Sequence, residues 1–94
     1  MAASDNGALS AGELGQAALT TVRELTGYRP EALTGLQWNG DRDLWTITVD
    51  ALELERIPNT TDILGEYEVQ LDQRGTLHGY RRTRRFVRGQ STEE

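Results

Sequence analysis

The segment Asp72-Gln73-Arg74-Gly75 constrains the fold of this chain more than any other stretch. Aspartate at its first position and glycine at its fourth, between two runs rich in β-forming residues, predict a type I turn that ends in a glycine G1 bulge. The two runs are therefore expected to pair as an antiparallel hairpin. The turn also predicts a register, with Leu71 beside Leu77, Glu68 beside Tyr80, Tyr67 beside Arg81 and Glu66 beside Arg82.

This register predicts an apolar face and a charged face for the hairpin. Alternation along the strands places four apolar residues together on the expected core side: Tyr67, Val69, Leu71 and Leu77. The other face is expected to carry Glu66, Glu68 and Gln70 beside His78, Tyr80, Arg82, Arg84, Phe86 and Arg88. Opposite charges that face each other across strands contribute roughly 0.2–1 kcal/mol each, which favours one register but does not explain a fold.

A helix is predicted ahead of the strands. Ser10 and Glu13 form the S-x-x-E pattern of a capping box, and Leu9 and Leu14 flank it at the positions of a hydrophobic staple. The apolar side of this helix is predicted to consist of Leu14, Ala18, Val22 and Leu25. Gly27 is placed to end the helix in the left-handed conformation.

Two strands are predicted between the helix and the hairpin. The first is expected from Leu33 to Trp38, and Asn39-Gly40 predicts a tight turn after it. The second is expected from Leu44 to Leu54. Its alternation changes phase near Asp50-Ala51, which predicts a β-bulge there.

The connection to the hairpin contains Pro58, which cannot donate a hydrogen bond to a strand ladder. Thr60 or Thr61 is expected to cap one helical turn that reaches Leu64, before a third strand that begins at Tyr67. These elements predict an α+β fold in which an N-terminal helix packs on a four-stranded antiparallel β-meander, in two layers. We predict one domain at residues 9–88 between disordered tails at 1–8 and 89–94.

Composition excludes several classes of protein. The chain of 94 residues has no cysteine and no lysine, which excludes a disulfide framework, a thiolate metal site, a Schiff base and a P-loop lysine. The first residues lack the basic and apolar segments of a signal peptide, and no apolar run is long enough to cross a bilayer. We therefore expect a soluble, cytoplasmic protein without membrane contact.

Catalytic patterns are not found in the sequence. His78 is the single histidine, and we interpret it as a solvated strand residue. Glu53 with Glu55, and Glu66 with Glu68, could serve acid–base chemistry or bind magnesium, but acidic residues that alternate with core residues are also typical of a solvated sheet face. We predict that the protein is not an enzyme and has no catalytic residue, metal site or cofactor.

Charge is segregated along the chain. Nine acidic residues lie between Asp41 and Asp72, whereas six arginines and no acidic residue lie between Gln73 and Gln90. Three interpretations stay open: the arginine-rich strand pairs with acidic strands of its own sheet, binds an acidic protein surface, or binds single-stranded RNA with its aromatic residues. The net charge of −5 would argue against nucleic acid if it were evenly spread, which it is not. Nucleic acid is nevertheless the least favoured of the three, because the rest of the domain would repel phosphates.

Four segments carry the most specific pattern in the chain. They are Trp45-x-Ile47-x-Val49-Asp50, Leu54-Glu55-Arg56-Ile57-Pro58-Asn59-Thr60-Thr61-Asp62-Ile63-Leu64, Tyr67-Glu68-Val69-x-Leu71-Asp72 and Gly79-Tyr80-Arg81-Arg82-x-Arg84-Arg85-Phe86-x-Arg88-Gly89. This set resembles the gas vesicle protein O (GvpO) family over roughly residues 20 to 90. The chain departs from the family pattern at Asp50, where glutamate is expected, and at Phe86, where tyrosine is expected.

The resemblance implies an accessory protein of gas vesicle formation in a bacterium, a minor component or assembly factor and not the main shell protein. It brings no catalytic residues with it. The implied partners are other gas vesicle proteins, both the shell protein and accessory proteins, and the implied location is the cytoplasm or the vesicle itself. The oligomeric state is left open.

We predict that such a protein shields the apolar shell protein by offering a sheet edge for strand addition or a groove beside the helix, with arginines that meet acidic partner surfaces. The predicted partner-binding residues are Arg56, Tyr80, Arg82, Arg84 and Arg85. Two alternatives belong to other functional classes: a small PepSY-like inhibitory or binding domain, and a single-stranded RNA-binding module.

Overall fold

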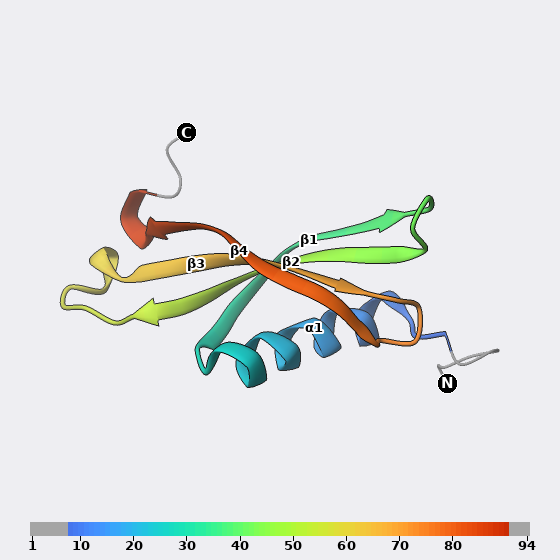
Figure 1. The fold of residues 1–94 in the computed structure, drawn as a ribbon. Helices are drawn as coiled ribbons and strands as arrows, with labels where there is room; N and C mark the ends of the chain where they lie inside the picture. Colours follow the sequence, from blue (N-terminus) through green and yellow to red (C-terminus); the bar gives the residue numbers. More distant parts are fainter. Residues whose placement is uncertain (1–7, 91–94) are drawn as a thin grey trace.

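The computed structural model of this protein describes residues 8–90, which form one helix followed by a four-stranded antiparallel sheet (Figure 1). The helix is α1 (Ala11–Thr26), and the strands are β1 (Arg29–Asn39), β2 (Leu44–Leu54), β3 (Ile63–Leu71) and β4 (Leu77–Val87). Short 3₁₀ helices η2 (Asn59–Thr61) and η3 (Arg88–Gln90) follow β2 and β4. The predicted α+β class and the order of its elements are confirmed. Of the predicted tails, residues 1–7 and 91–94 lie outside the described residues.

Helix α1 begins and ends as its sequence predicts. The Ser10 side chain accepts a hydrogen bond from the backbone N–H of Glu13 at 3.1 Å, and the Glu13 carboxylate accepts one from the backbone N–H of Ser10 at 2.8 Å. Gly27 ends the helix with φ 79°, and its N–H donates to the carbonyl of Arg23. The capping box and the glycine cap together satisfy backbone groups that a helix end leaves unpaired.

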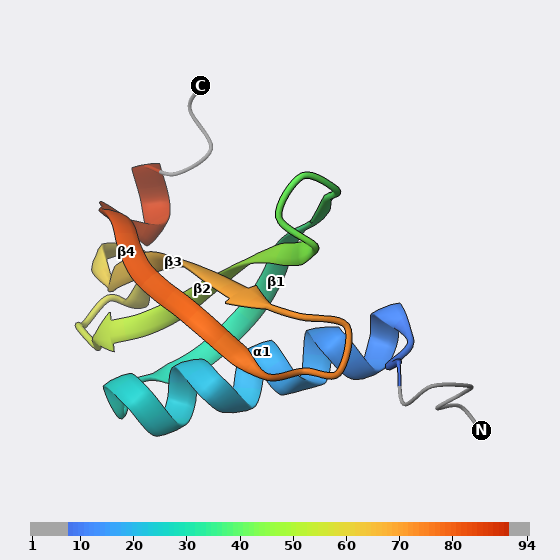
Figure 2. The ribbon, with the colours of Figure 1, turned by 45° about the vertical axis from the view of Figure 1, so that its right-hand side comes forward.

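The hydrophobic core lies between α1 and one face of the sheet (Figure 2). We call this the helix face and the opposite side the open face. The strands follow the order β1-β2-β3-β4. The core residues are Leu14, Ala18 and Val22 from the helix and Ile47, Val49, Ala51, Tyr67, Val69 and Leu71 from β2 and β3. Burial of these alternating side chains fixes which face of each central strand meets the helix.

Two predicted core residues are instead exposed. Leu25 is 45% exposed and lies at a groove between the end of α1 and β4. Leu77 is 38% exposed because it lies on β4, whereas the helix packs mainly on β1, β2 and β3. The apolar stripe of the helix is therefore one residue shorter than its spacing predicts.

The β3–β4 turn has the predicted geometry. Gly75 has φ 88°, its N–H donates to the carbonyl of Asp72 at 2.9 Å, and the N–H of Asp72 donates to the carbonyl of Thr76 at 3.0 Å. Leu71 pairs with Leu77 as predicted. The rest of the predicted register is wrong, since the observed pairs are Val69 with Tyr80, Glu68 with Arg81, Tyr67 with Arg82 and Glu66 with Arg84.

β-bulges cause this difference. An extra residue interrupts the ladder at His78 and again at Thr83 in β4. Two more lie in β1, at Glu31 and Thr34, and the bulge predicted near Asp50-Ala51 lies instead at Glu53 in β2. Each extra residue moves the following side chains to the other face, which simple alternation cannot predict.

The bounds of β2 agree with the prediction, whereas those of two neighbours do not. β1 begins at Arg29 instead of Leu33, because an edge strand can accommodate Pro30. The helical turn is η2 (Asn59–Thr61) instead of a turn that reaches Leu64, and β3 already begins at Ile63. No helix within residues 8–90 is long and apolar enough to cross a membrane.

The same substitution at two glycines should have opposite effects on stability. Gly75→Ala places a Cβ at positive φ and 2.8 Å from Leu9 Cδ1, so we expect it to lower the free energy of unfolding by about 1–2 kcal/mol. Gly12→Ala lies in the helix with open space around it, so we expect a gain of roughly 0.5–1 kcal/mol. Urea denaturation measures both, and equal effects would contradict the turn geometry.

Candidate functional site

The predicted partner-binding residues do not form one stripe on β4. The bulge at Thr83 divides them, so that Arg82 and Arg85 reach the helix face while Arg84 lies on the open face beside Glu66. Tyr80 pairs with the core residue Val69 and so also faces the helix side. The five predicted residues therefore contribute to three separate surfaces.

A nearly buried carboxylate joins two of these surfaces. The Glu53 side chain is only 3% exposed and accepts hydrogen bonds from the Tyr67 hydroxyl at 2.6 Å and from Arg82 Nε at 3.2 Å. Its other oxygen lies 3.2 Å from Arg85 Nε. The side chains of Arg82 and Arg85 are 43% and 54% exposed, so Glu53 holds both cations on side chains that still reach solvent.

Gly65 provides the space for this carboxylate. It lies opposite Ala51 in the sheet, and a Cβ atom at this position would overlap the Glu53 carboxylate and approach the Tyr67 ring. Any side chain at residue 65 would therefore displace the acceptor that holds Arg82 and Arg85. Burial, followed by the hydrogen bond to Glu53, raises the pKa of Tyr67 and keeps its hydroxyl protonated as a donor.

The first surface is a groove between the C-terminal end of α1 and β4, which we call the tyrosine groove. Its lining residues are Leu25, Thr26, Tyr28, Tyr67, Tyr80, Arg81 and Arg82. Leu25 and Tyr80 are each nearly half exposed. Aromatic rings beside guanidinium groups can bind apolar and acidic parts of a protein partner together.

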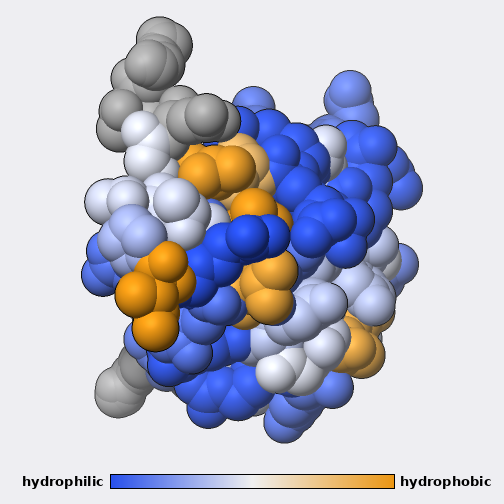
Figure 3. Space-filling model, turned by 90° about the vertical axis from the view of Figure 1, so that its left-hand side faces the viewer, coloured by the Kyte–Doolittle hydropathy of each residue, from blue (hydrophilic) through white to orange (hydrophobic). Residues whose placement is uncertain are grey.

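The second surface, which we call the distal pocket, lies where the sheet extends past the helix (Figure 1). Its lining residues are Leu54, Arg56, Ile63, Arg85, Phe86 and Val87. Figure 3 looks onto this end of the molecule and shows hydrophobic residues interrupted by strongly hydrophilic ones. The predicted residues Arg56 and Arg85 meet here although they are far apart in the sequence.

The third surface is on the open face. Arg84 Nε lies 3.4 Å from the Glu66 carboxylate, and its guanidinium lies 4.4 Å from the centre of the Phe86 ring. Asp50 pairs with Glu66 across the strands, and burial, followed by the charge of Glu66, raises the pKa of Asp50. Arg84 therefore neutralises an acidic pair within the sheet, as the intramolecular interpretation of the arginine strand predicts.

Asp62 anchors the loop beside the distal pocket. It is 3% exposed, and its carboxylate accepts from the backbone N–H of Arg56 at 2.8 Å and from Arg88 Nε at 3.1 Å. The backbone carbonyl of Asp62 accepts from the N–H of Arg88. The hydrogen bond from Arg56, followed by that from Arg88, lowers the pKa of Asp62.

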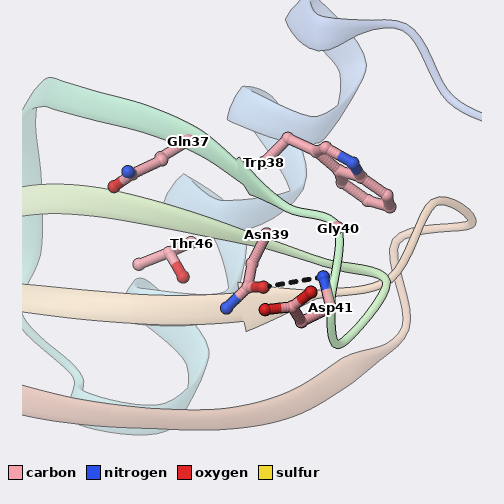
Figure 4. Close-up of a pocket in the computed structure, with 6 residues that line it drawn as sticks. All are labelled: Gln37, Trp38, Asn39, Gly40, Asp41 and Thr46. Carbon is pink, nitrogen blue, oxygen red and sulfur yellow. Dashed lines mark hydrogen bonds between the residues drawn. The ribbon is translucent and has the colours of Figure 1, made fainter.

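A further pocket, at the β1–β2 hairpin, has few groups that could take part in chemistry. It is lined by Gln37, Trp38, Asn39, Gly40, Asp41 and Thr46, and the Asn39 side chain accepts from the backbone N–H of Asp41 at 3.1 Å (Figure 4). Asp41 is its single carboxylate. Within residues 8–90 no group of three histidine or acidic side chains is placed to hold a metal ion.

Comparison with known proteins agrees with the sequence resemblance. A family model described as "Gas vesicle synthesis protein GvpO" matches residues 2–92. This chain belongs to the GvpO family. The predicted resemblance to GvpO is confirmed.

Curated GvpO proteins from bacteria and archaea are similar to this chain. Gas vesicle protein O of Streptomyces sp. (strain CB03234) is 45% identical over 74 residues, which cover 79% of this chain and 56% of that protein. Gas vesicle protein O of Haloferax mediterranei is 36% identical over 74 residues, which cover 78% of this chain and 51% of that protein. The chain thus spans about half the length of the curated relatives it matches. No solved structure matches it.

Sequence reasoning missed the residues that position the arginines. Glu53 was considered only as part of an acidic pair, and Gly65 and Asp62 were given no role. The change of phase at the end of β2 was a usable signal, because a bulge there sends an acidic side chain to the helix face. A glycine inside the neighbouring strand was a second signal of close approach.

The role of Gly65 can be tested with a double-mutant cycle. Gly65→Ala should displace the Glu53 carboxylate from its donors and lower the free energy of unfolding by about 3 kcal/mol, as loss of a buried ion pair does. In a Glu53→Ala background the carboxylate is gone and only the approach to the Tyr67 ring remains, so the same substitution should cost much less. Urea denaturation of the four proteins measures the coupling, and additive costs would refute it.

The role of Asp62 predicts a specific pH dependence. Because folding lowers the pKa of Asp62, its interactions stabilise the fold above the unfolded-state pKa of about 3.9 and are lost as pH falls through the lower folded-state pKa. The wild type should therefore be more stable than Asp62→Asn at neutral pH, and this advantage should shrink under acid. Urea denaturation at a series of pH values measures it. An advantage that stays constant into acid would contradict this role.

Proposed function

We propose that this chain is a non-enzymatic accessory protein of gas vesicle formation, which acts as an assembly factor or adaptor. Membership of the GvpO family supports a role in gas vesicle formation, and the names of the relatives place those proteins among gas vesicle proteins. The proposed partners are other gas vesicle proteins, either the shell protein or accessory proteins. The proposed location is the cytoplasm or the surface of the vesicle.

The tyrosine groove is the proposed docking surface, and the way Glu53 holds Arg82 is the observation that carries this proposal. Glu53 engages Arg82 through Nε, and the Arg82 side chain stays 43% exposed in the groove that Tyr80 also lines. The remaining guanidinium nitrogens carry further donors that a partner carboxylate can accept. Because the cation is already positioned, binding loses little side-chain entropy.

The strand edges favour side-chain docking over strand addition. Both β1 and β4 are edge strands, and two bulges interrupt each of them. Bulges twist an edge and interrupt the row of backbone groups that an added strand needs. Of the two routes predicted from the sequence, a groove beside the helix is therefore the better supported.

The other functional classes have less support. A single-stranded RNA platform needs stacking residues and cations along one path, but Tyr80 and Phe86 lie on different faces of β4. Several arginines of β4 also pair with glutamates of the same sheet. No specific contact favours a PepSY-like inhibitory role.

Tyr80→Ser tests the groove without disturbing an ion pair. We expect the wild-type chain to co-elute with at least one gas vesicle protein in size-exclusion chromatography, and the substitution to weaken that complex at least about tenfold, or 1.4 kcal/mol. Leu36→Ser removes an exposed apolar residue of β1 outside the groove and should leave the complex intact. Circular dichroism checks that both variants are folded.

Two results would overturn the proposal. One is a chain that forms no complex with the shell protein or with any accessory protein at low or moderate salt. The other is a complex that Tyr80→Ser and Leu36→Ser weaken equally. Co-elution with single-stranded RNA in place of protein would support the alternative class.

A further inference from the structure

An aliphatic side chain next to the distal pocket is displayed to solvent. Ile57 is 99% exposed, in the connection between β2 and β3, and Leu54 at the end of β2 is 46% exposed. Figure 3 shows hydrophobic surface at this end of the molecule. Exposed apolar surface that forms a contiguous patch with polar neighbours commonly marks an interaction site.

The loop that presents Ile57 is held at both ends. The backbone N–H of Arg56 donates to Asp62 at 2.8 Å, directly before Ile57. After it, the Thr61 hydroxyl donates to the carbonyl of Pro58 at 2.7 Å. Arg88 closes the loop against the end of β4 through both the side chain and the carbonyl of Asp62. Ile57 is therefore exposed on a positioned loop, which lowers the entropy lost when a partner covers it.

The charged residues that line the distal pocket have one sign. Arg56 and Arg85 line the pocket together with four apolar residues, and no acidic residue lines it. Arg56 makes no ion pair among the residues that the structure describes. Arg85 forms an ion pair with Glu53, but its side chain is still 54% exposed. An occupant that pairs with these cations must bring carboxylates.

We propose that the distal pocket binds a protein segment that carries aliphatic side chains beside carboxylates, as on an acidic amphipathic helix. The aliphatic side chains cover Ile57 and Leu54, and the carboxylates meet Arg56 and Arg85. A second copy of this chain fits poorly, because the same surface on both copies would bring like charges together. This inference rests on the proposed function as an adaptor and gives it a second docking site.

The two docking sites share one anchor. Glu53 holds Arg82 at the tyrosine groove and Arg85 at the distal pocket with its two oxygens. A partner carboxylate can accept from the guanidinium donors that Glu53 leaves free on either arginine. Both sites therefore depend on the same carboxylate for the position of a cation.

A peptide titration tests the chemistry of the occupant. The probe is a short amphipathic peptide of leucine and glutamate, and its control has lysine at every glutamate position. We expect the glutamate peptide to cause saturable shifts of the Leu54, Ile57, Ile63 and Val87 methyl groups in NMR spectra of the full chain. The lysine peptide should bind at least tenfold more weakly.

Matched variants separate this site from general hydrophobic attraction. Ile57→Ser and Arg85→Gln should each weaken the glutamate peptide at least tenfold. Leu36→Ser and Arg74→Gln make the same changes at exposed residues elsewhere and should leave its affinity unchanged. Because Arg85 contacts Glu53, Ile57→Ser is the decisive variant, since its side chain has no folded contact to lose.

Several results would overturn the inference. They are no saturable shift, equal binding of both peptides, shifts centred on β1, or binding of a single-stranded oligonucleotide in place of the peptide. The co-elution experiment shows whether only the distal-pocket inference fails or whether the proposed adaptor function fails as well. If Tyr80→Ser disrupts a complex with a gas vesicle protein and Ile57→Ser does not, the adaptor function holds and the distal pocket is not a docking site.

Discussion

The Glu53 carboxylate is the interaction on which both candidate surfaces depend. Removing a carboxylate from water is costly unless donors replace the lost solvation, and here three donors converge on it from β3 and β4. Its position requires a bulge in β2, which turns the side chain to the helix face, and a glycine on the neighbouring strand. One acidic residue therefore positions two cations that are exposed on different parts of the surface.

The bulges give this small sheet more surfaces than regular strands would. A regular β4 would place Arg82 and Arg84 on one face, but the extra residue at Thr83 sends them to opposite faces. The Thr83 hydroxyl itself donates to Glu66, so the bulge also completes the ion pair of Arg84. The bulges in β1 and β4 interrupt both edges of the sheet, which limits edge-to-edge association of this open sheet.

Local signals in the sequence predicted where the helix, strands and turns lie. The strand register and the positions of the bulges depend on contacts between strands and were missed. The Ser10 cap, the Gly27 cap and the Gly75 turn each depend on a few adjacent residues, so their chemistry can be read directly from the sequence. Register depends on where a bulge lies, and a bulge is stabilised by partners on other strands. The prediction placed Tyr80 and Arg82 on the open face with Arg84, whereas the bulges leave only Arg84 there and put Tyr80 and Arg82 on the helix face. The choice of Arg82 and Arg85 carried no reason why they should act together.

Internal pairing and partner binding are compatible roles for the same arginine, and the distinction governs how the site can be studied. Reversing the charge of Arg82 would place a carboxylate against Glu53 and leave a buried negative charge without a donor, so the fold would suffer whatever the partner does. Loss of function after such a reversal cannot separate the two roles. Tyr80 in the tyrosine groove and Ile57 beside the distal pocket do not join the Glu53 network. Substitution of either one leaves this carboxylate and its donors in place, so these two residues can separate the two roles.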